Sequence, residues 1–337
     1  MTRALKIRKA HLDQTIVVVS GWAANQNHQR GLRTPLSTSN RLTLRPKLKN
    51  RLRVAAIQFL NPAPLMWDFE HPPRNAKLAE RYDVHLTQPA LCADELLNGQ
   101  ADLGLIPVAS LTESLAVVPG CAIASLGQVR SIQLIVKRRS DSSSEPDDLL
   151  KKVRCIAADT ASRSSVAYAE VLFGRFLRTQ PEFVPFRADA EAMLEQADAA
   201  LLIGDPALLA LERRGEIEQA VGPCLWLDLA EQWIGRTGLP WVAAVWAVRP
   251  ESLGDASVTA SVLVKDLQQS RDRGLANVEQ LVSEWAGKIT LPAETIRTYL
   301  TRNIHYALTE ECIESLRCFR AYAAELGVLP ASELRFL

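Results

Sequence analysis

The stretch CIAADTASRSSVAYAEVLF, residues 155–173, sets the pattern from which the fold can be predicted. An apolar run of strand length at residues 153–158 leads into a polar loop, and the apolar repeat of a helix follows over residues 165–178. A strand that feeds directly into a helix is typical of largely parallel sheets covered by helices on both faces. The polar loop would then lie at the carboxyl edge of the sheet, where open α/β folds bind ligands.

Strand and helix patterns alternate over most of the remaining chain. We expect strands at residues 53–59, 83–87, 101–108, 121–126, 131–137, 182–186, 198–204 and 239–249, and helices at 90–100 and 191–196. Beyond the last of these strands only helical patterns remain, at residues 257–273, 275–287, 292–302 and 309–327. The sequence therefore predicts an α/β protein with an all-helical C-terminal region.

A polar, proline-containing break at residues 138–149 divides the alternation into two series and reads as a crossing between two lobes. The apolar strands at 131–137 and 239–249 would be the two connections. Two lobes joined twice form a hinge, and ligands bind in the cleft between such lobes. The predicted organisation is a disordered basic leader over 1–50, a first lobe from 51–137 plus 245–337, and a second lobe from 138–244.

Charge and composition limit the classes of partner. Of the 337 residues 47% are apolar, which is enough for a sizeable core, but no apolar run is long enough to cross a membrane. The first 50 residues hold ten Lys and Arg and a single acid, so the net charge of +1 conceals an acidic remainder. Because the basic excess belongs to the leader, we expect neither a nucleic-acid nor a membrane partner. No oligomeric partner can be named from the sequence.

Cysteine and histidine spacing argues against metal and redox chemistry. The six cysteines form no C-x-x-C pair, and the five histidines show neither H-x-H nor H-E-x-x-H spacing. Neither G-x-G-x-x-G nor G-x-x-x-x-G-K occurs, so no nucleotide phosphate loop is expected. We expect a reduced, cytoplasmic chain without a metal or cofactor.

The loop of the opening stretch concentrates groups that can bind an anion. Thr160, Ser162, Arg163, Ser164 and Ser165 surround the start of the predicted helix. The first turn of a helix offers unpaired N–H groups and a partial positive charge, and an arginine adds a forked contact to a carboxylate. Capping by Ser162 or Ser164 is the alternative, although it would use only one or two of the hydroxyls.

Three further positions follow or open predicted strands. Asn61 in FLNPAPL comes after a buried strand, and it either faces the cleft or makes a turn before proline. Ser131 opens an apolar strand after Arg130. Asp205 stands between a strand and Pro206, as a helix cap or as a polar contact to the ligand. These residues alone predict a cleft suited to a small organic acid, and they leave open whether the protein is a binder or an enzyme.

Six segments in register resemble the chorismate dehydratase family, which acts in the futalosine route to menaquinone. They are IQFLNPAPL (57–65), LLNGQADLGLIPV (96–108), CAIASLGQVRSIQLI (121–135), AADTASRSSV (157–166), DAALLIGDPAL (198–208) and DLAEQWIGRTGLPWVAAVWAVR (228–249). The resemblance covers about residues 51–330 and implies a periplasmic-binding-protein-like fold of type II in an intracellular enzyme without a cofactor. It further implies dehydration of chorismate to 3-[(1-carboxyvinyl)oxy]benzoate, with the enolpyruvyl carboxylate of the substrate taking the proton.

The resemblance also implies roles for individual residues. Asn61 and Ser131 would position the enolpyruvyl ether, its carboxylate and the leaving hydroxyl, and residues 160–165 would hold a carboxylate. Asp205 matches the Gly-Asp pair of the family. Two departures are mild: Gln128 replaces a common proline, and Ser164 replaces a threonine.

Two other functions share this fold. A solute-binding protein of a transporter is one, although no cysteine precedes Cys92 to serve as a lipid attachment site. A later naphthoate synthase of the same pathway is the other, and it would need a histidine in the cleft, where the motifs above place none.

Overall fold

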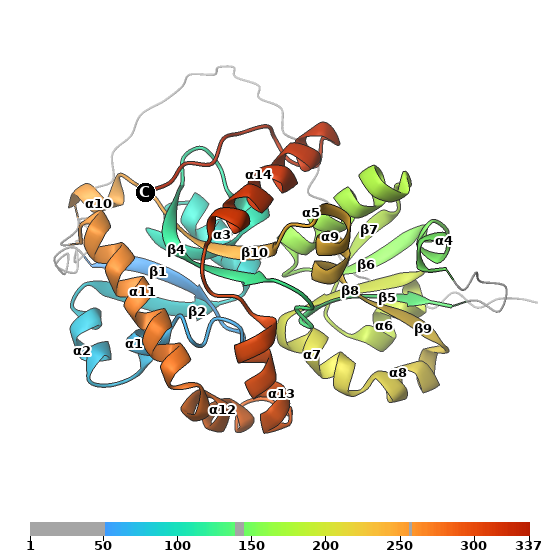
Figure 1. Cartoon of the computed structure of the whole chain (residues 1–337), viewed down its shortest axis with the longest axis horizontal. Coiled ribbons are helices and arrows are strands. Elements are labelled where there is room, and N and C mark those ends of the chain that lie inside the picture. The colour runs from blue at the N-terminus through green and yellow to red at the C-terminus, as the bar shows by residue number, and fades with distance from the viewer. Residues whose placement is uncertain (1–50, 139–144, 256–257) are drawn as a thin grey trace, which may run out of the picture. The chain divides into compact units, whose positions relative to one another are not determined.

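The structure of the protein is a computed structural model that describes residues 51–138, 145–255 and 258–337 (Figure 1). The predicted leader, residues 1–50, lies outside the described residues. Two five-stranded sheets organise the described chain, and each has helices packed against it. We call them, with their helices, the first and second lobe.

The first sheet has the strand order β2-β1-β3-β10-β4. Its strands are β1 (Leu52–Ile57), β2 (Tyr82–Thr87), β3 (Leu103–Pro107), β4 (Ala116–Ser125) and β10 (Trp241–Val248). Strand β1 runs parallel to β2 and β3, and β10 runs antiparallel to β3 and β4.

The second sheet repeats this topology with the order β7-β6-β8-β5-β9. Its strands are β5 (Ile132–Lys137), β6 (Cys155–Asp159), β7 (Glu182–Phe186), β8 (Ala199–Ile203) and β9 (Cys224–Asp228). Strand β5 runs antiparallel to β8 and β9, as β10 does in the first sheet. Each sheet therefore takes one antiparallel strand from the chain as it arrives from the other lobe, which makes both sheets mixed.

The helices follow the strands along the chain. In the first half they are α1 (Trp67–Glu70), α2 (Arg74–Ala79), α3 (Pro89–Leu97), the 3₁₀ turn η1 (Val108–Ser110), α4 (Pro146–Leu150), α5 (Arg163–Val171) and the π-helical η2 (Leu172–Leu177). The second half adds α6 (Ala190–Gln196), α7 (Gly204–Glu212), α8 (Arg214–Val221), α9 (Leu229–Thr237), α10 (Ser252–Asp255), α11 (Ala260–Ala276), α12 (Val278–Ala286), α13 (Ala293–Thr298), the π-helical η3 (Tyr299–Asn303) and α14 (Glu310–Glu325).

The predicted lobe boundary at residues 137/138 is wrong by one strand, and the boundary at 244/245 falls inside strand β10. Strand β5 belongs to the second sheet and β10 to the first, so the chain crosses between lobes at residues 126–131 and again through α9. The expected crossing at 138–149 falls inside the second lobe, with residues 139–144 outside the described part. An apolar strand pattern reveals burial but does not reveal which sheet receives the strand.

Burial follows the two-sided sheets. In β5, Ile132, Leu134 and Val136 join the core that runs through both lobes, while Ile135 joins a separate core on the opposite face. This alternation is the period of a strand covered on both sides. On the side of α5, Tyr168 joins the lobes. The centroid of its ring lies 3.8 Å from the ring centroid of Trp241 and 3.8 Å from that of Phe319. The Tyr168 hydroxyl also donates to the Val242 carbonyl oxygen at 3.2 Å.

Candidate functional site

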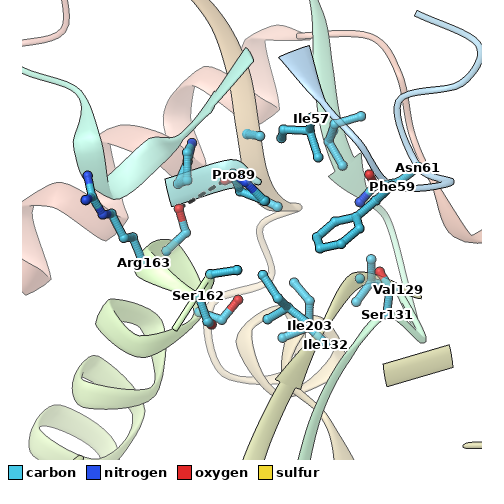
Figure 2. Close-up of a pocket in the computed structure, with 18 residues that line it drawn as sticks. Ile57, Phe59, Asn61, Pro89, Val129, Ser131, Ile132, Ser162, Arg163 and Ile203 are labelled. Atoms are coloured by element: carbon cyan, nitrogen blue, oxygen red, sulfur yellow. Dashed lines mark hydrogen bonds between the residues drawn. The ribbon is translucent and has the colours of Figure 1, made fainter. Parts of the chain in front are cut away.

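A cavity between the two sheets gathers most of the predicted residues (Figure 2). Its volume is about 50 Å³, room for no more than a few water molecules. It is built by the segment after β1, the start of β5, the first turn of α5, the end of β8 and the middle of β10. Of the predicted residues, Asn61, Ser131, Ser162, Arg163, Ser164 and Ser165 line it, while Thr160 and Asp205 do not.

Two polar side chains of the cavity are buried without a hydrogen-bond partner among the described residues. They are the Oδ1 atom of Asn61 and the Oγ atom of Ser162. Figure 2 places Asn61 and Ser131 on one side of the Phe59 ring and Ser162 on the other. Buried polar atoms are nearly always paired, so unpaired acceptors and hydroxyls in a cavity indicate groups kept for a ligand.

Asn61 lies in a segment that the first lobe holds rigidly. The α11 residue Gly274 packs so closely there that a Cβ atom on it would lie 2.1 Å from the carbonyl oxygen of Pro64. The hydroxyl of Ser270 donates to the Leu65 carbonyl oxygen at 2.7 Å. Asn61 therefore begins a fixed segment and does more than form a turn before proline.

Ser131 is buried at the point where the chain enters the second lobe. Its N–H donates to the Val129 carbonyl oxygen at 2.8 Å, and its own carbonyl accepts from Gly204 N–H at 2.8 Å. Gly204 has φ +61°, and a Cβ atom there would lie 2.6 Å from the Phe59 ring. The predicted serine, the end of β8 and Phe59 are thus packed together by a glycine that no larger residue could replace without displacing the ring.

Two tyrosines stand near these residues, and neither was predicted from the sequence. The hydroxyls of Tyr299 and Tyr306 are buried without a hydrogen-bond partner among the described residues. Burial raises the pKa of Tyr299, while the nearby Ser131 and Asn61 side chains oppose that rise without reaching hydrogen-bond geometry. Burial likewise raises the pKa of Tyr306, so both phenols stay protonated and can donate.

The opening stretch forms the opposite wall. Ser162 is the N-cap residue of α5, yet its side chain makes no capping bond. Ser164 is occupied, because its hydroxyl donates to the Ala243 carbonyl oxygen at 3.0 Å and accepts from Ala109 N–H at 3.2 Å. Capping therefore does not account for the hydroxyls. One of them ties the lobes together and another is left unpaired.

Arg163 and Thr160 are placed differently from the serines. The guanidinium of Arg163 donates from Nη2 to both oxygens of Asp94 on α3, at 2.7 and 2.8 Å, and in Figure 2 it points away from Ser131. Thr160 lines a neighbouring groove of about 410 Å³ that shares Ser162 and Arg163 with the cavity. The ion pair joins the two lobes beside the cavity, and the sequence pattern gave no sign that Asp94 pairs with Arg163.

Asp205 lies in the first turn of α7 and makes no capping bond, since the N-cap residue is Ile203. Its Oδ1 atom accepts from the N–H of Leu60 at 2.9 Å, which links the second lobe to the segment that carries Asn61. Burial raises the pKa of Asp205 to about 6, and the Leu60 N–H opposes that rise. Asp205 therefore does not cap α7, and the contact it makes is to the protein backbone, so its contact with a ligand stays a prediction.

The described residues offer no group of three or more His, Cys, Asp or Glu side chains able to hold a metal ion. Within the same part of the chain, no helix has the length and apolar character needed to cross a membrane.

Comparison with known proteins places this geometry in a family. A family model described as menaquinone biosynthesis matches residues 52–325. A curated chorismate dehydratase from Thermus thermophilus is 28% identical in an alignment of 267 residues that covers 74% of this chain and 88% of that protein.

Solved structures agree on the fold. A protein from Archaeoglobus fulgidus matches with a TM-score of 0.62 and 18% identity, over 83% of this chain and 98% of that one. A Candida albicans protein with the generic periplasmic binding protein structural fold matches with a TM-score of 0.59 and 11% identity, over 84% of this chain and 92% of that one. The predicted periplasmic-binding-protein-like fold is confirmed.

Proposed function

The chain belongs to the menaquinone-biosynthesis family, and from that premise we propose that it is a chorismate dehydratase, a hydro-lyase of the futalosine route. The observation that carries the proposal is the pair of unpartnered polar atoms, Asn61 Oδ1 and Ser162 Oγ, on opposite walls of a cavity between the lobes. A substrate with polar groups at both ends of an apolar ring would satisfy both walls. Chorismate, with two carboxylates on a cyclohexadiene, has that form.

The reaction removes the hydrogen at C3 and the hydroxyl at C4 and gives 3-[(1-carboxyvinyl)oxy]benzoate. The C3 proton passes to the enolpyruvyl carboxylate of the substrate, and the electron pair of the C–H bond becomes the C3–C4 π bond. The C4–O bond breaks with its electron pair on oxygen, and the hydroxyl leaves as water by taking the proton that the enolpyruvyl carboxylate had received. Because the ring becomes aromatic, the driving force lies in the substrate, and the protein mainly orients groups and stabilises charge.

We assign the two walls to the two ends of chorismate. Asn61 and Ser131 would hold the enolpyruvyl ether, its carboxylate and the leaving hydroxyl, with Tyr299 behind them as a neutral donor. The ring carboxylate would meet the first turn of α5, where the Ser162 hydroxyl and the partial positive charge of the helix are available. Ser165 would add a contact there, as would Arg163 once its pair with Asp94 opens, and Thr160 would line the approach.

The size of the cavity implies movement during each turnover. A volume of about 50 Å³ does not admit a substituted six-membered ring, so the Phe59 ring or the lobes must move for chorismate to enter. The two crossings at residues 126–131 and α9 are where such a movement would bend. Closure around the ligand then excludes water from the reacting carbons. Asp205 lies outside the cavity and would act through its hydrogen bond with Leu60 N–H. We place the reaction in the cytoplasm.

The test is incubation of the purified protein with chorismate, followed by absorbance and mass spectrometry. We expect the mass to fall by one water and an aromatic absorbance to appear, in proportion to protein concentration. Saturable binding with chorismate recovered unchanged would reject the dehydratase and favour a solute-binding protein for a small organic acid. A boiled sample and a variant with Asn61→Ala serve as controls.

A further inference from the structure

The turn that presents Ser131 to the cavity has an unusual backbone. Arg130 has φ +61°, in the left-handed region that residues other than glycine rarely adopt. The hydrogen bond from Ser131 N–H to the Val129 carbonyl oxygen, 2.8 Å long, closes a γ-turn around it. A γ-turn with positive φ is rare and strained, and such strain persists only where neighbouring groups enforce it.

One carboxylate enforces this turn. Asp228, at the end of β9 and 7% exposed, accepts on Oδ2 from Arg130 N–H at 2.6 Å. The Nε2 atom of Gln133, the residue paired with Asp228 across β5 and β9, donates to the same oxygen at 3.3 Å and to the Arg130 carbonyl oxygen at 3.1 Å. Both the N–H and the C=O of the strained residue are thereby held by buried side chains.

The other oxygen of Asp228 holds the second crossing between the lobes. Oδ1 accepts from the N–H groups of Ala230 and Glu231 at 3.1 Å each, which caps the start of α9. The turn at Arg130 ends the first crossing, and α9 begins the second. A single buried side chain therefore joins both connections to the backbone that positions Ser131.

We propose that Asp228 is a positioning residue for Ser131, which locks the strained turn at Arg130 and fixes it to the hinge helix α9. The positioning role of Asp228 rests on the proposed function, because that function gives Ser131 its task. The geometry of the turn does not depend on which substrate is bound. Among the described residues, this carboxylate accepts hydrogen bonds from the N–H groups of Arg130, Ala230 and Glu231 and from the Gln133 amide. Only an acceptor with two equivalent oxygens satisfies them together, because an amide would turn its own NH₂ toward one pair of donors.

The experiment compares three variants. Asp228→Asn keeps the shape but loses one acceptor. Asp189→Asn makes the matched change at the cap of α6, where Asp189 Oδ1 accepts from Ala192 N–H. The double variant Asp228→Asn/Arg130→Gly places glycine, which adopts positive φ without strain, at the centre of the turn. Each is assayed for kcat and KM with chorismate and for hydrogen exchange in peptides that cover residues 126–133.

We expect Asp228→Asn to lower kcat roughly 10- to 100-fold with little change in KM, since a small misplacement of a reacting group has that cost. Hydrogen exchange at the Ser131 amide should become faster. In the double variant, Arg130→Gly should restore at least part of the lost kcat and part of the slow exchange. Asp189→Asn should leave both unchanged. Wild-type kcat and exchange in Asp228→Asn, or a loss that glycine does not relieve, would show that Asp228 only caps α9 and would overturn the proposal.

The experiment also covers two further cases, a variant that does not fold and a wild-type protein without dehydratase activity. If Asp228→Asn does not fold, Gln133→Met, which removes the second clamp on Arg130, replaces it and should show faster Ser131 exchange. Unchanged exchange in that variant overturns the proposal. If the wild-type protein does not dehydrate chorismate, the proposed function fails, while the exchange measurements still decide whether Asp228 holds the turn.

Discussion

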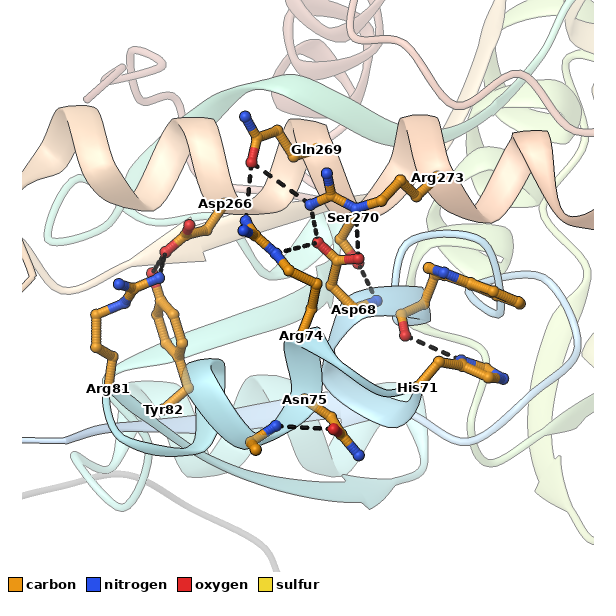
Figure 3. A network of polar contacts seen from close by, with 12 residues as sticks. Asp68, His71, Arg74, Asn75, Arg81, Tyr82, Asp266, Gln269, Ser270 and Arg273 are labelled. Atoms are coloured by element: carbon orange, nitrogen blue, oxygen red, sulfur yellow. Dashed lines mark hydrogen bonds and ion pairs between the residues drawn. The ribbon is translucent and has the colours of Figure 1, made fainter.

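Two buried polar regions of the protein differ in whether their partners are supplied by the chain. In the first lobe, helix α1 places Asp68 against α11 (Figure 3). The Nε atom of Arg273 donates to Asp68 Oδ1 at 2.6 Å, Nη2 of the same arginine bonds Oδ2, and Asp68 N–H donates to the Ser270 hydroxyl at 2.9 Å. We call Asp68, Ser270 and Arg273 the α11 network.

The polar groups of the cavity between the lobes are also buried, but several of them are not paired with other groups of the described residues. Asn61 Oδ1, Ser162 Oγ and the Tyr299 hydroxyl lack hydrogen-bond partners among the described residues. A paired buried network gives rigidity, whereas unpaired groups cost stability unless something binds them. We therefore expect variants in the α11 network to change stability and variants in the cavity to change activity.

The largest expected effect is on stability, from Arg273→Met in the α11 network. It leaves the Asp68 carboxylate, which is 1% exposed, without its main partner. We expect the free energy of unfolding to fall by about 3 kcal/mol, at the low end for a broken buried pair because 38% of the Arg273 side chain is exposed. Urea unfolding measures this, and kcat per folded molecule should stay near that of the wild type.

The control for this variant is Arg297→Met, which removes an arginine paired with Glu279 and Glu294 on the surface. Surface pairs contribute little, so its unfolding midpoint should barely move. Equal losses in the two variants would remove the distinction between the α11 network and an ordinary surface pair.

The second effect is on turnover, from Asn61→Ala and Ser131→Ala. Each should lower kcat for chorismate by about 100-fold, the usual loss when one group that stabilises developing charge is removed. The free energy of unfolding should stay the same or rise, because Asn61 Oδ1 has no partner to lose.

Ser110→Ala is the matched control, since its Oγ atom is also buried with no hydrogen-bond partner in the described part of the chain but lies outside the cavity lining. It should keep wild-type kcat. A comparable loss of turnover in Ser110→Ala would mean that unpaired hydroxyls in this protein affect activity wherever they lie.

The third effect depends on pH and concerns Asp205. Burial raises its folded pKa to about 6, above its ordinary value, so its contribution to stability is greatest at low pH and is lost as pH rises through about 6. From pH 4 to pH 7 the wild type should lose about 2 kcal/mol of unfolding free energy relative to Asp205→Asn. Parallel pH profiles for the two proteins would show that Asp205 is not buried beside Leu60 in solution.

The smallest effect separates two roles of Arg163. If its guanidinium binds a carboxylate of chorismate, Arg163→Ala should raise KM about tenfold, while Asp94→Ala should leave KM unchanged or lower because it frees the arginine. Equal changes in KM for both variants would mean that the pair acts only as a contact between the lobes.

Apart from β9, which was not predicted, the strands of the described residues and most of the cavity could be predicted, because both follow from patterns of neighbouring residues. The run EFVPF at residues 182–186 coincides with β7. Ser131 directly precedes β5, Ser162 directly precedes α5, and Asn61 follows β1 by a few residues, so each lies near an element that the pattern can locate. The two lobe boundaries were wrong because an antiparallel strand inserted into the other sheet has the same apolar pattern as any buried strand.

The rest of the site depends on contacts between distant segments. Tyr299 reaches Asn61 from a π-helical turn that reads as ordinary helix, and the clustering of Tyr299 and Tyr306, two of only five tyrosines, was the one available signal. Asp94 and Asp228 are acidic residues on a helix and at a strand end, which pattern interprets as surface and cap. Nothing in the sequence showed that Arg130 adopts positive φ, since that conformation is imposed by its partners.

We propose that the unpaired groups of the cavity bind chorismate, and a crystal structure of Ser131→Ala soaked with chorismate would decide this. We expect density between the lobes, with the enolpyruvyl carboxylate beside Asn61 and the ring carboxylate at the first turn of α5 within hydrogen-bond distance of Ser162 Oγ. Chorismate bound only in the neighbouring groove beside Thr160, with Asn61 Oδ1 and Ser162 Oγ still unpaired, would contradict it.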